Sequence, residues 1–254
     1  MTSDNPDKDV AFGFRRVAEG DKQGLVNEVF AKAALRYDQM NDLMSVGLHR
    51  LWKDDLIAML APPRRATPFH VLDVAGGTGD IAFRIVRAGG AGTRVTVADI
   101  SPEMVAEGRK RAAAEGFAGR CEFTVGNAEA LAFPDRGFEA YTIAFGIRNV
   151  VDREQGCREF ARVLGPGGRL AILEFGTPQL PGLRQLYQWY FRAVLPKIGG
   201  LISGNRDAYA YLPASVGEFP PPAEFADVLR RAGFREVEWK ALTFGVVYLY
   251  IATK

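Results

Sequence analysis

Hydrophobic and polar residues follow two periods along the chain, and each period predicts one type of element. Before residue 69, apolar residues recur at helical spacing in two segments, 25–37 and 48–60. From residue 69 on, short apolar runs typical of buried strands alternate with helical segments. The predicted strands are 71–74, 94–98, 121–125, 139–144 and 169–174, and the predicted helices between them are 80–88, 102–115 and 152–164. This β-α-β order predicts an open, doubly wound α/β sheet with helices on both faces.

The pattern changes after Gly176. Residues 177–221 form a proline-rich insertion with an aromatic-rich segment at 183–195, and a predicted helix at 223–232 then leads into strands 234–239 and 243–250. The short gap between these strands cannot hold a crossover helix, so the last strand is predicted to be antiparallel. We expect a mostly parallel seven-stranded sheet in residues 69–254. Residues 1–68 would add a loose tail of about 20 residues and a helical cap to the same domain.

Composition narrows the classes of function. The 254 residues carry 32 Lys and Arg against 30 Asp and Glu, and this balance predicts no nucleic-acid partner. Two cysteines are too few for a disulfide framework or a cysteine zinc site, and with only His49 and His70 we expect no metal centre and no histidine triad. The N-terminal residues do not read as a secretory signal, so a cytoplasmic protein is expected. The chemistry is therefore expected to rest on a bound cofactor.

A glycine-rich loop is the strongest local signal for such a cofactor. The first predicted strand of the sheet runs directly into a helix through Asp73-Val74-Ala75-Gly76-Gly77-Thr78-Gly79-Asp80. Gly77 and Gly79 would let the backbone approach a ligand, and the helix N-terminus offers unpaired N–H groups. Asp99 ends the second strand, where an acid can bind two ribose hydroxyls. Loop and acid together predict a cofactor that contains adenosine.

Two kinds of adenosine-containing cofactor fit this loop, a nicotinamide dinucleotide and S-adenosylmethionine. Gly77-x-Gly79-x-x-Ala82 also satisfies a relaxed dinucleotide fingerprint, which alone is a weak signal. Three features favour S-adenosylmethionine: Asp73 inside the first strand, where the cofactor's amino group can pair with it; Asn127-Ala128 after the third strand, where adenine would bind; and the terminal hairpin. A nicotinamide-binding domain would be expected to continue with parallel strands.

Three longer motifs carry a resemblance to a known family. They are Tyr37-Asp38-x-Met40-Asn41-x-x-Met44-Ser45-x-x-x-His49-x-x-Trp52, then Phe145-Gly146-Ile147-Arg148-Asn149-Val150, and Arg162-Val163-Leu164-Gly165-Pro166-Gly167-Gly168-Arg169-Leu170 followed by Leu173-Glu174-Phe175. With them the chain resembles, over about residues 12–253, the ubiquinone/menaquinone biosynthesis C-methyltransferases. These are S-adenosylmethionine-dependent methyltransferases of class I, with a Rossmann-like fold. The chain departs from the usual family pattern at Gly165, which replaces Lys, and at Ala144 and Gly176, which replace Ser.

The resemblance implies methylation of a ring carbon of a polyprenylated demethyl-benzoquinol, a demethylmenaquinol, or both. It places cofactor contacts at Thr78, Asp99, Asn127, Ala128 and Ala144. It also implies that Arg148 and Asn149, with a water, accept the phenol proton. Because guanidinium stays charged in proteins, we interpret Arg148 as stabilising the phenolate while Asn149 orients the water. The alternative is a structural arginine that pairs with Asp152.

Substrate contacts are expected from the N-terminal motif and from the insertion. Tyr37, Asn41, His49 and Trp52 would form part of a lid over the quinol head. The alternative is helix packing for the aromatic residues and a buried, capped side chain for His49. The aromatic insertion, flanked by basic residues, predicts peripheral contact with a membrane surface. Packing on the sheet and a homodimer interface are the alternatives.

Two other functions stay open at this level. One is methylation of another small aromatic or lipid acceptor with the same cofactor. The other is a non-catalytic scaffold that binds S-adenosylmethionine in a quinone-biosynthesis complex. Arg148 and Asn149 count against the scaffold. No motif distinguishes a benzoquinol from a naphthoquinol.

Overall fold

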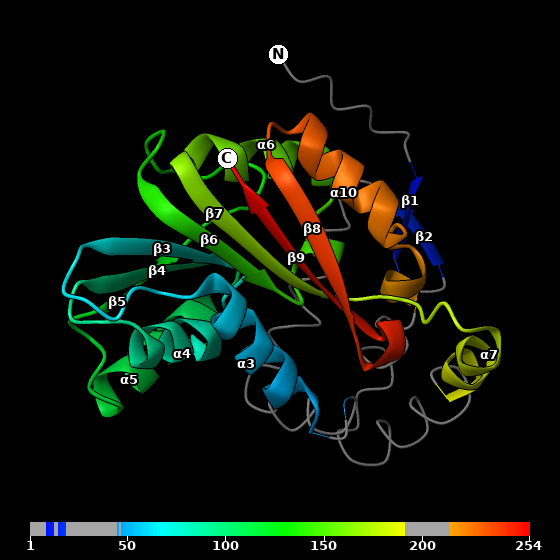
Figure 1. The fold of residues 1–254 in the computed structure, drawn as a ribbon, viewed down its shortest axis with the longest axis horizontal. Helices are drawn as coiled ribbons and strands as arrows, with labels where there is room; N and C mark the ends of the chain where they lie inside the picture. Colours follow the sequence, from blue (N-terminus) through cyan, green and yellow to red (C-terminus); the bar gives the residue numbers. More distant parts are fainter. Residues whose placement is uncertain (1–8, 13–14, 19–44, 46, 191–213) are drawn as a thin grey trace.

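A seven-stranded sheet forms the centre of the computed structural model, which describes residues 9–12, 15–18, 45, 47–190 and 214–254 (Figure 1). The sheet has the order β5-β4-β3-β6-β7-β9-β8. Its strands are β3 (Phe69–Val74), β4 (Thr93–Asp99), β5 (Cys121–Val125), β6 (Phe138–Ala144), β7 (Leu164–Phe175), β8 (Arg235–Leu242) and β9 (Val247–Thr253). Strands β3 to β7 pair in parallel, and β9 is antiparallel to both β7 and β8. The predicted sheet and its antiparallel last strand are confirmed.

Helices cover both faces of the sheet, as a doubly wound fold requires (Figure 1). On one face lie α3 (His49–Leu60), α4 (Asp80–Ala88) and α5 (Pro102–Ala114), and on the other lie α6 (Arg153–Val163) and α10 (Pro222–Arg231). Buried apolar side chains such as Leu56 and Phe83 fill the first layer, and Phe160 and Phe225 fill the second. These two layers exclude water from both faces and stabilise the strands between them.

Local capping explains where two of the helices start. At α5 the Ser101 hydroxyl accepts a hydrogen bond from the Met104 N–H at 3.2 Å, and Pro102 occupies the first helical position. At α6 the Asp152 carboxylate accepts from the Gln155 N–H at 2.9 Å. These caps satisfy N–H groups that have no partner within the helix. They explain why both helices begin within one residue of the predicted position.

Two short segments near the N-terminus correct the prediction of a loose tail. Asp9–Phe12 (β1) and Arg15–Ala18 (β2) pair as a separate two-stranded antiparallel sheet, so the prediction of a loose tail was wrong for these residues. The two strands are separated in the sequence by only Gly13 and Phe14, a spacing typical of a tight hairpin. Hydrogen bonds between the strands satisfy backbone groups that a tail would leave to water.

Parts of the predicted cap and insertion lie outside the described residues. These parts include the helix predicted at 25–37, the motif residues 37–44 and residues 191–213 of the insertion. Within the insertion, α7 (Pro181–Trp189) is described and follows β7. Among the described residues, no helix has the length and apolar character needed to cross a bilayer.

Candidate active site

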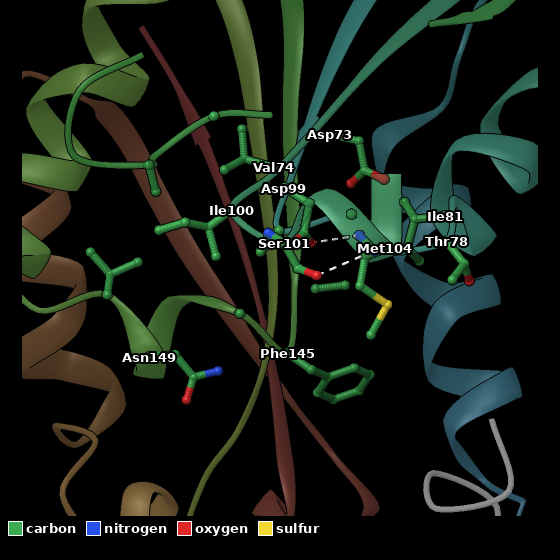
Figure 2. Close-up of a pocket in the computed structure, with 18 of the residues that line it drawn as sticks. Asp73, Val74, Thr78, Ile81, Asp99, Ile100, Ser101, Met104, Phe145 and Asn149 are labelled. Atoms are coloured by element: carbon green, nitrogen blue, oxygen red, sulfur yellow. Dashed lines mark hydrogen bonds between the residues drawn. The ribbon is translucent and has the colours of Figure 1, made fainter. Parts of the chain in front are cut away.

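A cavity lies at the carboxyl ends of β3, β4 and β6 (Figure 2). The strand order reverses between β3 and β6, and ligands of such sheets bind at this point. Most of the lining comes from four segments: the end of β3 with its glycine loop, the end of β4, the residues after β5, and the end of β6 with the turn that follows. Figure 2 shows Asn149 of that turn on the opposite side of the cavity from Thr78. A ligand there would contact parts of the chain far apart in sequence.

The glycine loop joins β3 to α4 through backbone conformations that favour glycine. Gly77 and Gly79 have φ angles of +55° and +90°. A Cβ on Gly79 would lie 2.7 Å from the ring of Phe123, whereas a Cβ on Gly77 would meet nothing within 4 Å. Gly79 therefore permits close packing beneath the loop. Gly77 lines the cavity, and space is open beside it.

Asp99 fixes the loop to the end of β4. Its Oδ2 accepts a hydrogen bond from the Gly77 N–H at 2.8 Å, and its Oδ1 accepts from the Ser101 N–H at 2.9 Å. Burial raises the pKa of the Asp99 carboxyl, although these backbone hydrogen bonds oppose the shift. The side chain lines the cavity with its position held on both oxygens. An acid held this way suits ribose hydroxyls.

Asp73 lies one residue before the end of β3 and is fully buried. The Thr142 hydroxyl donates to its Oδ1 at 2.7 Å, while its Oδ2 has no hydrogen-bond partner among the described residues. Burial raises the pKa of this carboxyl to about 7. A buried oxygen without a partner is costly, and a cationic ligand group would satisfy it. The site therefore fits the cofactor's ammonium group.

The remaining predicted cofactor residues surround the same space. The Thr78 hydroxyl accepts from Nη1 of Arg111 at 2.6 Å, and the Asn127 Oδ1 accepts from the Glu129 N–H at 3.0 Å, which shapes the segment after β5. The cavity lining contains every residue predicted to bind cofactor except Gly79: Asp73, Gly77, Thr78, Asp99, Asn127, Ala128 and Ala144. The fold thus brings together residues from the ends of four strands and the loops that follow them.

Arg148 and Asn149 lie in a short 3-10 turn (η2, Ile147–Asn149) after β6. Asn149 lines the cavity, whereas the Arg148 side chain points into the interior and pairs with Glu174 of β7 at 2.9 Å. Pairing with Asp152, the structural alternative considered from sequence, was therefore wrong, because Asp152 caps α6 instead. The Nε of Arg148 is buried without a partner among the described residues.

Two of the predicted substrate residues, His49 and Trp52, are described by the structure, and neither lines the cavity. His49 is buried on α3, with its Nδ1 2.8 Å from the Ser45 hydroxyl. The Trp52 Nε1–H donates to the Thr243 hydroxyl at 2.8 Å, and its ring packs against Phe145, which lines the cavity. Tyr37 and Asn41 lie outside the described residues.

Lys53 is a lining residue that sequence reasoning missed. It belongs to α3, is 5% exposed, and its Nζ donates to Asp80 Oδ2 at 2.7 Å. The buried face of α3 contains His49, Trp52, Lys53, Leu56, Ile57 and Leu60. A charged residue within that helical stripe is a signal, because lysine is rarely buried without a partner.

Comparison with known proteins identifies the family. The model of the ubiE/COQ5 methyltransferase family matches residues 16–254. The chain belongs to this family. A relative from Nitrobacter hamburgensis, described as "Ubiquinone/menaquinone biosynthesis C-methyltransferase UbiE", is 53% identical over 247 residues, which cover 97% of this chain and 98% of that protein. A relative of the same description from Methylobacterium nodulans is 51% identical over 254 residues, covering 100% of this chain and 99% of that protein.

Solved structures agree on the fold. An S-adenosylmethionine-dependent methyltransferase from Aquifex aeolicus has a TM-score of 0.57 at 18% identity, covering 85% of this chain and 97% of that one. Phosphoethanolamine N-methyltransferase 2 of Haemonchus contortus, in complex with S-adenosylmethionine, has a TM-score of 0.59 at 16% identity, covering 80% and 52%. The predictions of the family, the class I fold, a C-methyltransferase and S-adenosylmethionine as cofactor are confirmed.

One departure from the usual family pattern, Gly176, is explained by its neighbour Tyr248 in this structure. A Cβ on Gly176 would lie 2.5 Å from ring carbons of Tyr248 on β9. A serine at this position would require the Tyr248 ring to move. Glycine at 176 therefore fits the large side chain that this chain carries at 248.

Proposed function

We propose that this chain transfers a methyl group from S-adenosylmethionine to a ring carbon of a polyprenylated quinol, either a demethyl-benzoquinol or a demethylmenaquinol. The description of the relatives as ubiquinone/menaquinone biosynthesis C-methyltransferases supports this substrate class. One observation carries the proposal: a single cavity is lined both by the acids Asp73 and Asp99 and by Asn149 of the turn after β6. Methyl donor and acceptor would meet there.

The cofactor, when bound, supplies an activated methyl group on a sulfonium. In the proposal Asp99 binds the ribose hydroxyls, and Asn127 with Ala128 holds the adenine. Asp73 pairs with the ammonium group through its unpartnered Oδ2. Gly77, Thr78, Gly79 and Ala144 complete the cofactor-binding set. Orientation of the two reactants accounts for much of the rate, because the methyl group needs no further activation.

The chemical step left to the chain's own residues is removal of the phenol proton. A ring carbon becomes nucleophilic when the adjacent phenol ionises, so a proton acceptor and a stabilising charge are needed. Asn149, which lines the cavity, orients the water that takes the proton. Arg148 supplies positive charge, and the pair with Glu174 fixes its guanidinium beneath the turn. Because Arg148 does not line the cavity, its charge would act on the phenolate through the protein and not by direct contact.

The proposal also assigns the N-terminal motif and the insertion to the substrate. Tyr37, Asn41, His49 and Trp52 belong to a cap over the quinol head, and Trp52 acts through Phe145, on which it packs.

Polyprenyl quinols reside in membranes, so we place the reaction at the cytoplasmic membrane surface. Leu180 and Trp189, at either end of α7, are 57% and 59% exposed and support contact with a bilayer interface. Co-flotation with liposomes of anionic lipid tests this contact, and failure to float would contradict it.

The test of function supplies methyl-labelled S-adenosylmethionine with a reduced demethylated benzoquinol or naphthoquinol. Label is expected in the ring of one or both quinols. The oxidised quinone is the matched control, because it has no phenol to ionise and should not accept label. Cofactor binding without label in either quinol would overturn the proposal. Label in other small phenols alone would favour a different acceptor, and no transfer at all would favour the scaffold.

A further inference from the structure

Charge is distributed unevenly around the cavity. The acids that line it are Asp73, Asp80, Asp99 and Glu129. Lys53 is the one positively charged side chain among the described residues that line the cavity. S-adenosylmethionine carries two cationic groups, the sulfonium and the ammonium, and one anionic group, the carboxylate. The acidic lining matches the cations, and the carboxylate requires a positive partner.

The position of Lys53 suits that role. Its side chain is 6% exposed, and its Nζ lies 2.7 Å from Asp80 Oδ2 at the start of α4. Among the described residues, Asp80 accepts a hydrogen bond from this ammonium. A lysine ammonium has further N–H donors besides the one that binds Asp80. Buried charges usually make several hydrogen bonds. The remaining donors of Lys53 are therefore available to a ligand in the cavity.

Asp73 and Lys53 lie close enough to act on each other. Burial is the main cause of the raised pKa of Asp73, and the positive charge of Lys53 is among the effects that oppose it. The ammonium and the carboxylate of the cofactor are attached to the same carbon atom. An acid and a lysine that line one cavity therefore form a matched pair for an amino-acid group.

We propose that Lys53 binds the carboxylate of S-adenosylmethionine, opposite the ammonium that pairs with Asp73. This makes α3, which precedes the sheet in the sequence, part of the cofactor site. Lys53 is a binding residue in this role, and the Asp80 carboxylate holds its side chain in place. The inference rests on the cofactor alone and not on the identity of the methyl acceptor.

The test compares two ligands that differ in the carboxylate alone. Isothermal titration calorimetry measures the affinity of wild-type protein and of Lys53→Met for S-adenosylmethionine and for decarboxylated S-adenosylmethionine. Wild type should bind the intact cofactor about tenfold or more tightly than the decarboxylated one, which is the effect expected of a charge-assisted hydrogen bond. Lys53→Met should lose this preference by weakening the binding of the intact cofactor only.

Two further variants separate binding from structure. Asp80→Asn removes the ion pair between α3 and α4 but keeps the lysine and an amide oxygen that can accept from it, so the preference for the carboxylate should fall less than in Lys53→Met. Lys110→Met removes a lysine on α5 whose side chain is 76% exposed, and both affinities should stay unchanged. Thermal unfolding without ligand checks that each variant is folded.

Several outcomes would overturn the inference. Equal affinities of wild-type protein for the two ligands would do so without any variant, and this readout stands even if Lys53→Met fails to fold. A uniform loss for both ligands in Lys53→Met would assign Lys53 to packing. These results are independent of the proposed function: carboxylate preference without quinol methylation would contradict the proposed substrate alone, and methylation without carboxylate preference would contradict the role of Lys53 alone.

Discussion

Arg148 and Glu174 form an ion pair at 2.9 Å, with side chains that are 5% and 0% exposed. Glu174 also accepts hydrogen bonds from the main-chain N–H of Arg148 at 3.1 Å and of Phe175 at 2.8 Å. One carboxylate of β7 thus holds both the guanidinium and the backbone of the turn after β6. Since Asn149 is the next residue of that turn, the ion pair sets the position of the polar side chain that faces the cavity.

Breaking this pair should destabilise the protein strongly. Arg148→Ala or Glu174→Ala leaves an uncompensated charge in the interior, which costs about 3–5 kcal/mol of unfolding free energy. Urea unfolding measures this change, and a double variant should lose less than the sum of the two single losses. The control is Arg158→Ala, whose ion pair with Glu154 is more than half exposed and contributes at most about 1 kcal/mol. Equal losses in buried and exposed variants would contradict the structural role.

Replacing Gly77 by Ala should reduce cofactor binding with a small cost in stability. The positive φ angle of +55° costs an alanine about 1–2 kcal/mol, and no atom lies within 4 Å of the new Cβ in the protein itself. Bound S-adenosylhomocysteine, the product of the reaction, would meet that methyl group.

Gly116→Ala is the matched control for Gly77→Ala. Gly116 follows α5 with a φ angle of +77° and also has open space around it, but it does not line the cavity. The two variants should lose similar stability in urea, and only Gly77→Ala should bind S-adenosylhomocysteine more weakly by calorimetry. Equal affinities for the two variants would show that the cofactor does not approach the loop at Gly77.

Asp99→Asn should weaken cofactor binding by about tenfold to a hundredfold, the effect of losing charge-assisted hydrogen bonds. Both carboxylate oxygens accept main-chain N–H groups, and an amide can accept on one side only. The variant would therefore lose the ribose contact and also disturb Gly77. Calorimetry with S-adenosylhomocysteine measures the loss, and Asp227→Asn on the exposed surface of α10 should show none. An unchanged affinity in Asp99→Asn would remove Asp99 from the site.

The features that were predictable from sequence are local. The β-α-β order follows from hydrophobic period, and the antiparallel last strand follows from a gap too short for a helix. The glycine loop and Asp99 could be found because strand ends of a parallel sheet meet at one edge. Contacts between distant elements could not be found in this way. Lys53 pairs with Asp80 across α3 and α4, and Trp52 bonds Thr243, which is 191 residues away.

The partner of Arg148 shows the same limit. Sequence proximity favoured Asp152, but that carboxylate already satisfies an N–H group at the start of α6. Glu174, 26 residues after Arg148, becomes its neighbour only because β6 and β7 pair in parallel. The pairing depends on the register of two strands, which no local pattern specifies.

Asp73 should make the ligand-free protein less stable as pH rises. Burial raises its pKa to about 7 in the folded state, above the ordinary value of about 3.9 expected in the unfolded chain. Between these values the folded state binds more protons than the unfolded state, so the free energy of unfolding falls as pH increases, by at most about 1.4 kcal/mol per pH unit. Asp73→Asn should gain stability over wild type from pH 4 to 7 and level off above. Urea unfolding at pH 5 and 8 measures the gain, and Asp227→Asn should show no such trend.

The same carboxyl should make cofactor binding depend on pH. Only the ionised form of Asp73 pairs with an ammonium, so affinity for S-adenosylhomocysteine should fall below pH 7, by at most about tenfold per pH unit. The ligand's own amino group stays protonated in this range and does not produce the trend. 5′-Methylthioadenosine lacks the amino-acid group, and its affinity should change much less with pH. Asp73→Asn should flatten the profile of S-adenosylhomocysteine toward that of 5′-methylthioadenosine. Parallel profiles for the two ligands in wild-type protein would show that Asp73 does not hold the ammonium, because protonation of the carboxyl would then affect both ligands alike.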